Sequence, residues 1–161
     1  MESIELRQAT PDDYDFAFSV HCAAMRTSVE QTYGWDEDWQ IRYFREHFDP
    51  AERQIIRYCG TDVGYISIEE QKTRFFLNSI AILPAYQGRG IGTTLIRRLQ
   101  QRARKEGVPV TLQVFKVNPA RALYERLGFK VTGETDTHCR MKWSSVSNER
   151  EEPCRNRIDV R

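Results

Sequence analysis

The chain has 161 residues, of which 40% are hydrophobic and 29% are charged, and its formal net charge is +1. This length and composition are typical of one globular domain with a sizeable core. The near-neutral charge argues against nucleic acid as the main partner, because nucleic-acid binders carry a basic face. No apolar run approaches the roughly 20 residues that span a bilayer, so we expect no membrane partner.

Cysteine usage indicates a reducing compartment. The four cysteines are scattered without a C-x-x-C pair, which is neither a zinc spacing nor a disulfide framework. The acidic start of the chain lacks the apolar core of a secretory signal. We therefore expect reduced thiols, a cytoplasmic location and no metal site. A monomer and a homodimer are both compatible with the sequence.

Hydrophobic periodicity and turn residues predict a mixed α/β layer. Helices are expected from 10 to either 25 or 29, and over 37–48, 91–105 and 118–128. Strands are expected over 4–9, 54–59, 63–71, 74–83 and 109–117, followed by strand-like sequence over 129–143. The helix over 37–48 is expected to turn Trp39, Tyr43, Phe44 and Phe48 toward the core. Residues 1–143 form the predicted domain, and 144–161 are expected to be a flexible tail because they are poor in apolar residues.

A glycine-rich loop, Q-G-R-G-I-G over 87–92, separates an apolar strand from a helix. Glycines let a backbone turn tightly and approach a ligand closely. The unpaired N–H groups at a helix start are a site for phosphate. The spacing matches neither a P-loop nor the dinucleotide fingerprint. The glycines alone are equally compatible with a plain strand-to-helix turn.

A second stretch, N-P-A-R-A-L-Y-E-R-L-G-F over 118–129, favours the phosphate site. It reads as a short helix with Asn118 as its cap, Pro119 at the first position and Gly128 at its left-handed end. Together, Q-x-x-G-x-G and N-x-A-x-x-L-Y-x-x-x-G-F resemble the GNAT superfamily of N-acetyltransferases. The resemblance is specific over 63–130, and over 4–62 only the order of elements is compatible.

The resemblance implies a mainly antiparallel central sheet flanked by helices, whose fourth and fifth strands splay apart around acetyl-CoA. It also implies that loop backbone N–H groups hold the CoA pyrophosphate at Gln87, Gly88, Arg89, Gly90, Ile91, Gly92 and Thr93. The backbone at Ile80 and Ile82 would pair with the pantetheine arm and polarise the thioester carbonyl, while their side chains could equally serve the core. Asn118 would be both a cap and a CoA contact.

Tyr124 stands where the family places a general acid, and it would protonate the departing thiolate. The alternative is an aromatic residue that only packs. The general base is less defined, because the strand over 77–81 has no carboxylate. We choose Glu69, which shares strand parity with Tyr65 and Ser67 in the more polar row.

Three alternatives to Glu69 as the base remain open. Glu69 could be an exposed strand end, Asn78 or Ser79 could position a water, or His138 could accept the proton. In the family, the region between the first two helices borders the acceptor site. Its aromatic and acidic residues would suit a cationic amine, or could simply form a packed helix start, at Tyr33, Trp35, Asp36, Glu37, Asp38 and Trp39.

The expected function is transfer of an acetyl group from acetyl-CoA to a primary amine of a small molecule, peptide or protein. One alternative is a non-catalytic acyl-CoA sensor of the same fold, which would not need Tyr124. Another is an acetyltransferase toxin that acts on aminoacyl-tRNA, against which the near-neutral charge argues. Five basic residues on the helix over 91–105 are either a solvated face or a contact to a ligand phosphate: Arg97, Arg98, Arg102, Arg104 and Lys105.

Overall fold

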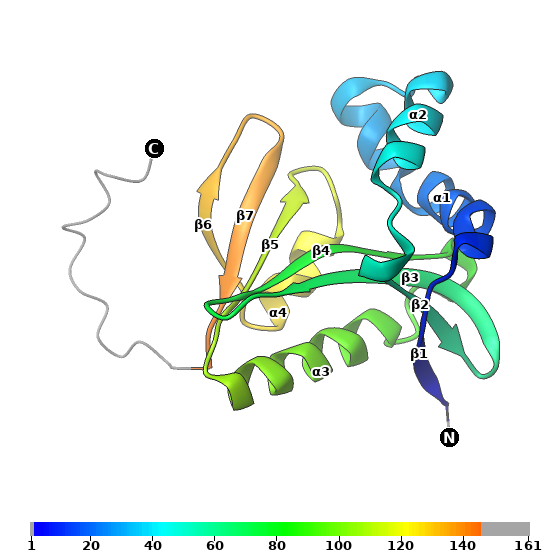
Figure 1. Cartoon of the computed structure of the whole chain (residues 1–161). Coiled ribbons are helices and arrows are strands. Elements are labelled where there is room, and N and C mark those ends of the chain that lie inside the picture. Colours follow the sequence, from blue (N-terminus) through cyan, green and yellow to red (C-terminus); the bar gives the residue numbers. More distant parts are fainter. Residues whose placement is uncertain (1, 146–161) are drawn as a thin grey trace.

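The computed structural model describes residues 2–145, so most of the predicted tail lies outside the described residues. A seven-stranded sheet has the order β1-β2-β3-β4-β5-β7-β6, and every neighbouring pair is antiparallel except β4 and β5 (Figure 1). The strands are β1 Ile4–Gln8, β2 Arg53–Tyr58, β3 Thr61–Glu70, β4 Phe75–Ile82, β5 Val110–Phe115, β6 Lys130–Glu134 and β7 His138–Trp143.

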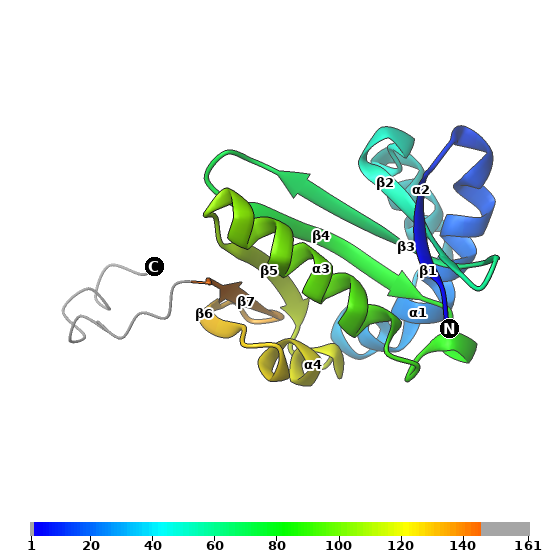
Figure 2. The same cartoon turned by 90° about the horizontal axis from the view of Figure 1, so that it is seen from below.

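Helices cover both faces of this sheet. The α-helices are α1 Tyr14–Tyr33, α2 Glu37–His47, α3 Ile91–Glu106 and α4 Ala120–Arg126, and the 3₁₀ turns are η1 Pro11–Asp13, η2 Pro50–Glu52 and η3 Pro84–Tyr86. Helices α3 and α4 pack on one face, and α1 and α2 pack on the other (Figures 1 and 2). The predicted mixed α/β architecture is confirmed, with the last strand-like stretch forming the β6–β7 hairpin.

The larger core lies beneath α3. Residues four apart along this helix are buried at Ile91, Leu95, Leu99 and Ala103, as the periodicity predicts. They contact sheet residues whose side chains project to the same face, such as Ile66. Burial of this stripe fixes α3, and therefore the loop before it, against the sheet.

The parallel strands β4 and β5 pair only at their beginnings. Their register joins Phe75, Phe76 and Leu77 of β4 to Val110, Thr111 and Leu112 of β5. Beyond these pairs the two strands diverge, and both views show it (Figures 1 and 2). The predicted splay of the fourth and fifth strands is therefore confirmed, and it opens toward the end of β4 that carries the glycine loop.

The prediction for the first two helices is wrong in two respects. Helix α1 continues to Tyr33, so the connection to α2 is only three residues long. Trp39 and Tyr43 do not face the core, because they are 47% and 43% exposed. Phe44 enters the core as predicted, since it is 3% exposed and packs against Phe18 of α1. Tertiary contacts therefore select a helix face that is rotated from the one we predicted.

Charged side chains attach the start of α1 to the sheet. The Arg7 guanidinium donates to both carboxylate oxygens of Asp13, at 2.7 and 2.9 Å, and to Asp62 at 2.9 Å. The Arg7 hydrogen bonds lower the pKa of Asp13 to about 2.

In residues 2–145, no helix has both the length and the apolar character of a membrane span.

Candidate active site

The glycine loop leaves a row of backbone donors without acceptors. Gly88 and Gly90 adopt φ angles of +77° and +81°, which L side chains disfavour. Within the described part of the chain, no group accepts a hydrogen bond from the N–H groups between Gly88 and Thr93. Because these donors stand at the positive end of α3, they form a site suited to an anion.

The expectation of an open N–H group at Gln87 is wrong, because this group donates to the carbonyl oxygen of Pro84 at 3.2 Å within the turn before the loop. The Gln87 side chain instead helps to hold the loop in place. The Gln87 amide donates to the carbonyl oxygen of Ile82 at 2.9 Å, which ties the loop to the end of β4. The Arg89 guanidinium lies over the rings of Tyr86 and Tyr58, at 5.1 and 5.9 Å from their centroids. Arg89 belongs to the loop, is exposed, and rests its side chain on these two rings.

The start of α3 also meets α4. A Cβ built on Gly92 would lie 3.7 Å from Leu123 of α4 and 3.8 Å from Ile82 of β4. The structure therefore brings together the three segments that the sequence motifs single out. Asn118 acts as a cap at the start of α4, because its Oδ1 accepts from the N–H of Ala120 at 2.9 Å. The helix begins at Ala120, one residue later than the position we expected.

The edge of β4 changes at the point where β5 leaves it. Ser67 of β3 pairs with Ser79, and Ile68 pairs with Leu77, so Asn78 is an extra residue in β4. Such a bulge re-aims neighbouring backbone groups and ends regular pairing. Downstream, Ile80 and Ile82 pack against the core beneath α3. Their side chains serve the core, and their backbone groups stand in the part of β4 that β5 does not pair.

Tyr124 is positioned to keep its proton. Its side chain lies on α4 within the core beneath α3 and α4, and its ring meets Phe129 edge-on at 5.7 Å. Burial raises the pKa of Tyr124 to about 12, so the phenol is neutral at physiological pH. Burial is the one cause of this pKa shift, and no hydrogen bond from the described residues contributes to it.

The candidate base Glu69 projects to the opposite face of the sheet from Tyr124. Its neighbour Glu70 forms an ion pair with Arg102 of α3, so strand alternation directs Glu69 toward the side of α1 and α2. This is the face to which Tyr65 also projects. Glu69 is half-buried and pairs with Phe76, near the closed end of the strand separation.

The alternative bases lie farther along the same opening. The Ser79 hydroxyl next to the bulge is buried without a hydrogen-bond partner among the described residues. Such a group is costly unless a water or a ligand satisfies it. His138 begins β7 beside the free end of β5, where its ring packs on Phe115 at 4.3 Å and Nδ1 lies 2.7 Å from the Thr137 hydroxyl. Burial lowers the pKa of His138, so the ring is neutral at pH 7 and able to accept a proton.

Helix α1 contacts the β6–β7 hairpin across the free end of β5. The Tyr33 hydroxyl lies 3.2 Å from the Thr137 hydroxyl, and its ring meets Phe115 edge-on at 6.0 Å. Next along the chain, the Trp35 indole donates to Glu37 at 2.7 Å. The contacts of Tyr33 place the end of α1 beside the free end of β5.

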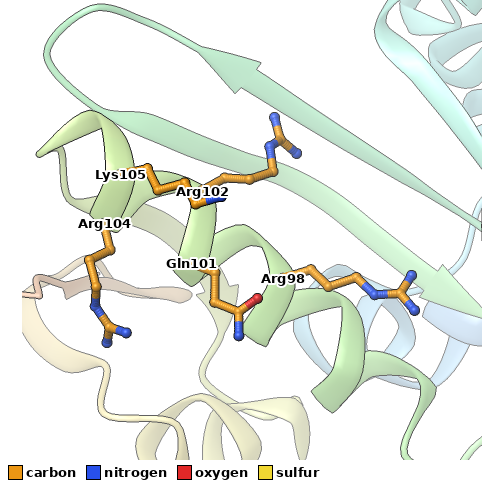
Figure 3. Close-up of a pocket in the computed structure, with 5 residues that line it drawn as sticks. All are labelled: Arg98, Gln101, Arg102, Arg104 and Lys105. Carbon is orange, nitrogen blue, oxygen red and sulfur yellow. The ribbon is translucent and has the colours of Figure 1, made fainter.

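The basic residues of α3 do not converge on a ligand site. An open depression of about 430 Å³ is lined by Arg98, Gln101, Arg102, Arg104 and Lys105, whose side chains spread in different directions (Figure 3). Arg98 donates to the carbonyl oxygen of Ile4, Arg102 pairs with Glu70, and Arg104 lies 5.8 Å from the Trp143 ring centroid. These contacts favour a solvated helix face with structural roles.

No group of three metal-ligating side chains occurs within residues 2–145.

Sequence reasoning missed three features of this region. It did not anticipate the buried Ser79 hydroxyl, the rest position of Arg89 on two tyrosine rings, or the outward direction of Tyr43. Alternation in β4 gave no sign of the bulge that repositions Ser79. The Arg89 contact joins β2 to the glycine loop, and no local pattern encodes such a pairing.

Comparisons with known proteins agree with this arrangement. The model of the acetyltransferase (GNAT) family matches residues 16–129. The N-alpha-acetyltransferase RimI of Mycobacterium tuberculosis is 36% identical over 124 residues, covering 73% of this chain and 75% of that protein. The [ribosomal protein bS18]-alanine N-acetyltransferase of Haemophilus influenzae is 46% identical over 68 residues, which are 42% of this chain and 47% of that protein.

A solved structure shares the fold. The PaiA N-acetyltransferase of Thermoplasma acidophilum, in complex with coenzyme A, superimposes with a TM-score of 0.73. It is 19% identical in sequence, and the match covers 88% of this chain and 99% of that one.

Proposed function

Because the chain belongs to the GNAT acetyltransferase family, we propose that this acetyl-CoA-dependent acyltransferase transfers the acetyl group to the α-amino group of a peptide or protein. The row of open N–H groups from Gly88 to Thr93 is the observation that carries the proposal. It supports binding of the CoA phosphates beside the opening between β4 and β5. The names of the two relatives, an N-alpha-acetyltransferase and an alanine N-acetyltransferase, support an α-amine as the acceptor.

The loop would hold the cosubstrate through its backbone at 88–93, with Arg89 turning from the tyrosine rings toward a phosphate. The unpaired stretch of β4 at Ile80 and Ile82 would extend this contact along the pantetheine arm. An N–H group there would polarise the thioester carbonyl as negative charge develops on its oxygen. Asn118, whose Oδ1 caps α4, keeps its amide nitrogen for a further contact to CoA.

In the reaction, the neutral amine nitrogen attacks the thioester carbon. A C–N bond forms, the C–S bond breaks, and the CoA sulfur leaves with the electron pair. Tyr124 donates its proton to this sulfur from the α3 and α4 side. The amine loses its extra proton on the opposite side, to Glu69 through a water held by the Ser79 hydroxyl. The acid would thus lie on the side of the departing sulfur and the base on the side of the attacking amine, with the acetyl carbon between them.

A thiol-release assay with acetyl-CoA tests the acceptor. We expect CoA release with short peptides that carry a free α-amine, and none with the same peptides after N-terminal blocking. Lysine side chains in the blocked peptides provide the matched control for a general amine. Release with small amines or aminoglycosides but not with any free peptide would contradict an α-amine acceptor and leave the acetyl-CoA chemistry standing.

A further inference from the structure

Helix α2 carries an exposed ladder of aromatic rings that neither the core nor the proposed chemistry uses. We define this α2 ladder as Trp39, Tyr43 and His47. The Trp39 and Tyr43 rings stack at 4.8 Å with an interplanar angle of 12°, and the Tyr43 and His47 rings stack at 4.0 Å and 23°. A spacing of four residues aligns all three along one side of the helix.

Other side chains anchor α2. Phe44 packs against aromatic rings of α1 and β3, including Tyr14 and Tyr65, and Gln40 hydrogen-bonds His21 of α1 at 2.9 Å. The helix would therefore stay in place without the ladder. A single exposed aromatic residue needs no explanation, but a continuous strip of stacked rings is a surface that a partner can cover.

The charge around the ladder selects the chemistry of that partner. The start of α2 carries three consecutive acidic residues, the cap Asp36 and the first-turn residues Glu37 and Asp38, and none of them forms an ion pair within the described residues. Over residues 36–47 the sequence has four acidic and two basic residues, although the whole chain has a net charge of +1. Carboxylates beside aromatic faces attract cationic side chains.

The position of the ladder relates it to the acceptor. Tyr33, at the end of α1, touches the β6–β7 hairpin beside the opening between β4 and β5. Helix α2 begins four residues later. It stands at the end of the molecule where β5 ends and where the β6–β7 hairpin makes its turn (Figure 1). A chain whose first residue enters the opening would continue past the start of α2.

We propose that the α2 ladder and its acidic first turn dock lysine and arginine side chains of the acceptor, several residues downstream of its α-amine. This inference rests on the proposed function. The aromatic faces bind the cationic groups and their aliphatic stems, and Asp38 pairs with one of them. The enzyme would then favour basic protein N-termini over neutral or acidic ones.

Three synthetic peptides with the same first four residues test the docking. One ends there, one continues with lysine and arginine, and one continues with glutamine at the same positions. We expect the basic peptide to have a KM about tenfold lower than the glutamine peptide, which corresponds to about 1.4 kcal/mol. Trp39→Ala, Tyr43→Ala and Asp38→Asn should each remove this advantage. For Tyr43→Ala, the kcat and the KM of the four-residue peptide should stay the same.

Val131→Ala, which trims an exposed apolar side chain on β6, is the matched control and should leave the preference intact. Equal KM values for the two long peptides would overturn the proposal. A dimer of the wild type that Tyr43→Ala dissociates in sedimentation would also overturn it, by showing that a second copy covers the ladder. If no peptide is acetylated, binding of the labelled basic peptide decides separately: anisotropy sensitive to Tyr43→Ala supports the docking, and no binding overturns it.

Discussion

The two sides of the opening between β4 and β5 use different kinds of groups. On the side of α3 and α4, the proposed acetyl-CoA contacts are mostly backbone N–H groups, held by the left-handed Gly88 and Gly90. On the side of α1 and α2, the proposed acceptor contacts are side chains such as Tyr33 and Trp39. A backbone site depends on where glycines stand, so a short motif reports it. A side-chain site depends on which face of a helix stays exposed to solvent after the other face packs into the core.

The largest effect is expected on the first side, at Tyr124. Tyr124→Phe keeps the buried ring and removes its proton, so we expect the stability to change little. Because burial raises the pKa of Tyr124 to about 12, the wild-type phenol holds this proton across the neutral range. Turnover should fall roughly 10²-fold while acetyl-CoA affinity is retained. Wild-type turnover by the variant between pH 6 and 9 would show that Tyr124 only packs.

A smaller effect is expected at Glu69, on the other face. Glu69→Gln should lower kcat by about tenfold, because a water held by Ser79 can still release its proton to solvent. Glu70→Gln is the matched control, since Glu70 pairs with Arg102 on the far face. If both variants have the same kcat, another group must accept the proton of the amine. His138 would then be the next residue to substitute.

Acid stability sharpens the comparison further, because ionic contacts fix the start of α1. The pKa of Asp13 is lowered to about 2 in the folded state by Arg7, below its ordinary value of 3.8. Its contribution is therefore full above about pH 4 and is lost as the pH falls toward 2. Asp13→Asn should cost on the order of 1 kcal/mol at pH 7 and flatten this part of the stability profile. Denaturant unfolding of wild type and Asp13→Asn at pH 2 to 7 measures the cost and its pH dependence. If the difference in unfolding free energy between the two proteins is the same at every pH, the lowered pKa of Asp13 is contradicted.

The smallest effect is expected from removal of residues 144–161. Their composition offers little apolar surface to bury, so a chain that ends at Trp143 should keep its melting temperature within a few degrees. It should also bind acetyl-CoA as the full chain does. Calorimetry and thermal unfolding of the shortened chain decide this, and a large loss of either property would assign a role to the segment.

The sequence predicts the local structure of the first side far better than that of the second. The glycine pattern anticipates the left-handed residues, and strand alternation separates Glu69 from Glu70. The exposed face of α2 could not be predicted, because adjacent helix stripes are both aromatic and only the packing of Phe44 against α1 selects one. The bulge at Asn78 likewise depends on the register between β3 and β4, which no local pattern fixes.

Calorimetric titration of acetyl-CoA into wild type, Gly90→Asp and Gly92→Ala tests the central claim that the loop backbone holds the CoA phosphates. Gly90→Asp puts a negative side chain beside the open N–H groups at a left-handed position, and its affinity should fall tenfold or more, on the order of 1.4 kcal/mol. Gly92→Ala adds a methyl group that meets only ordinary contacts, so its affinity should stay close to wild type. Equal affinity of a folded Gly90→Asp variant and the wild type would contradict the account.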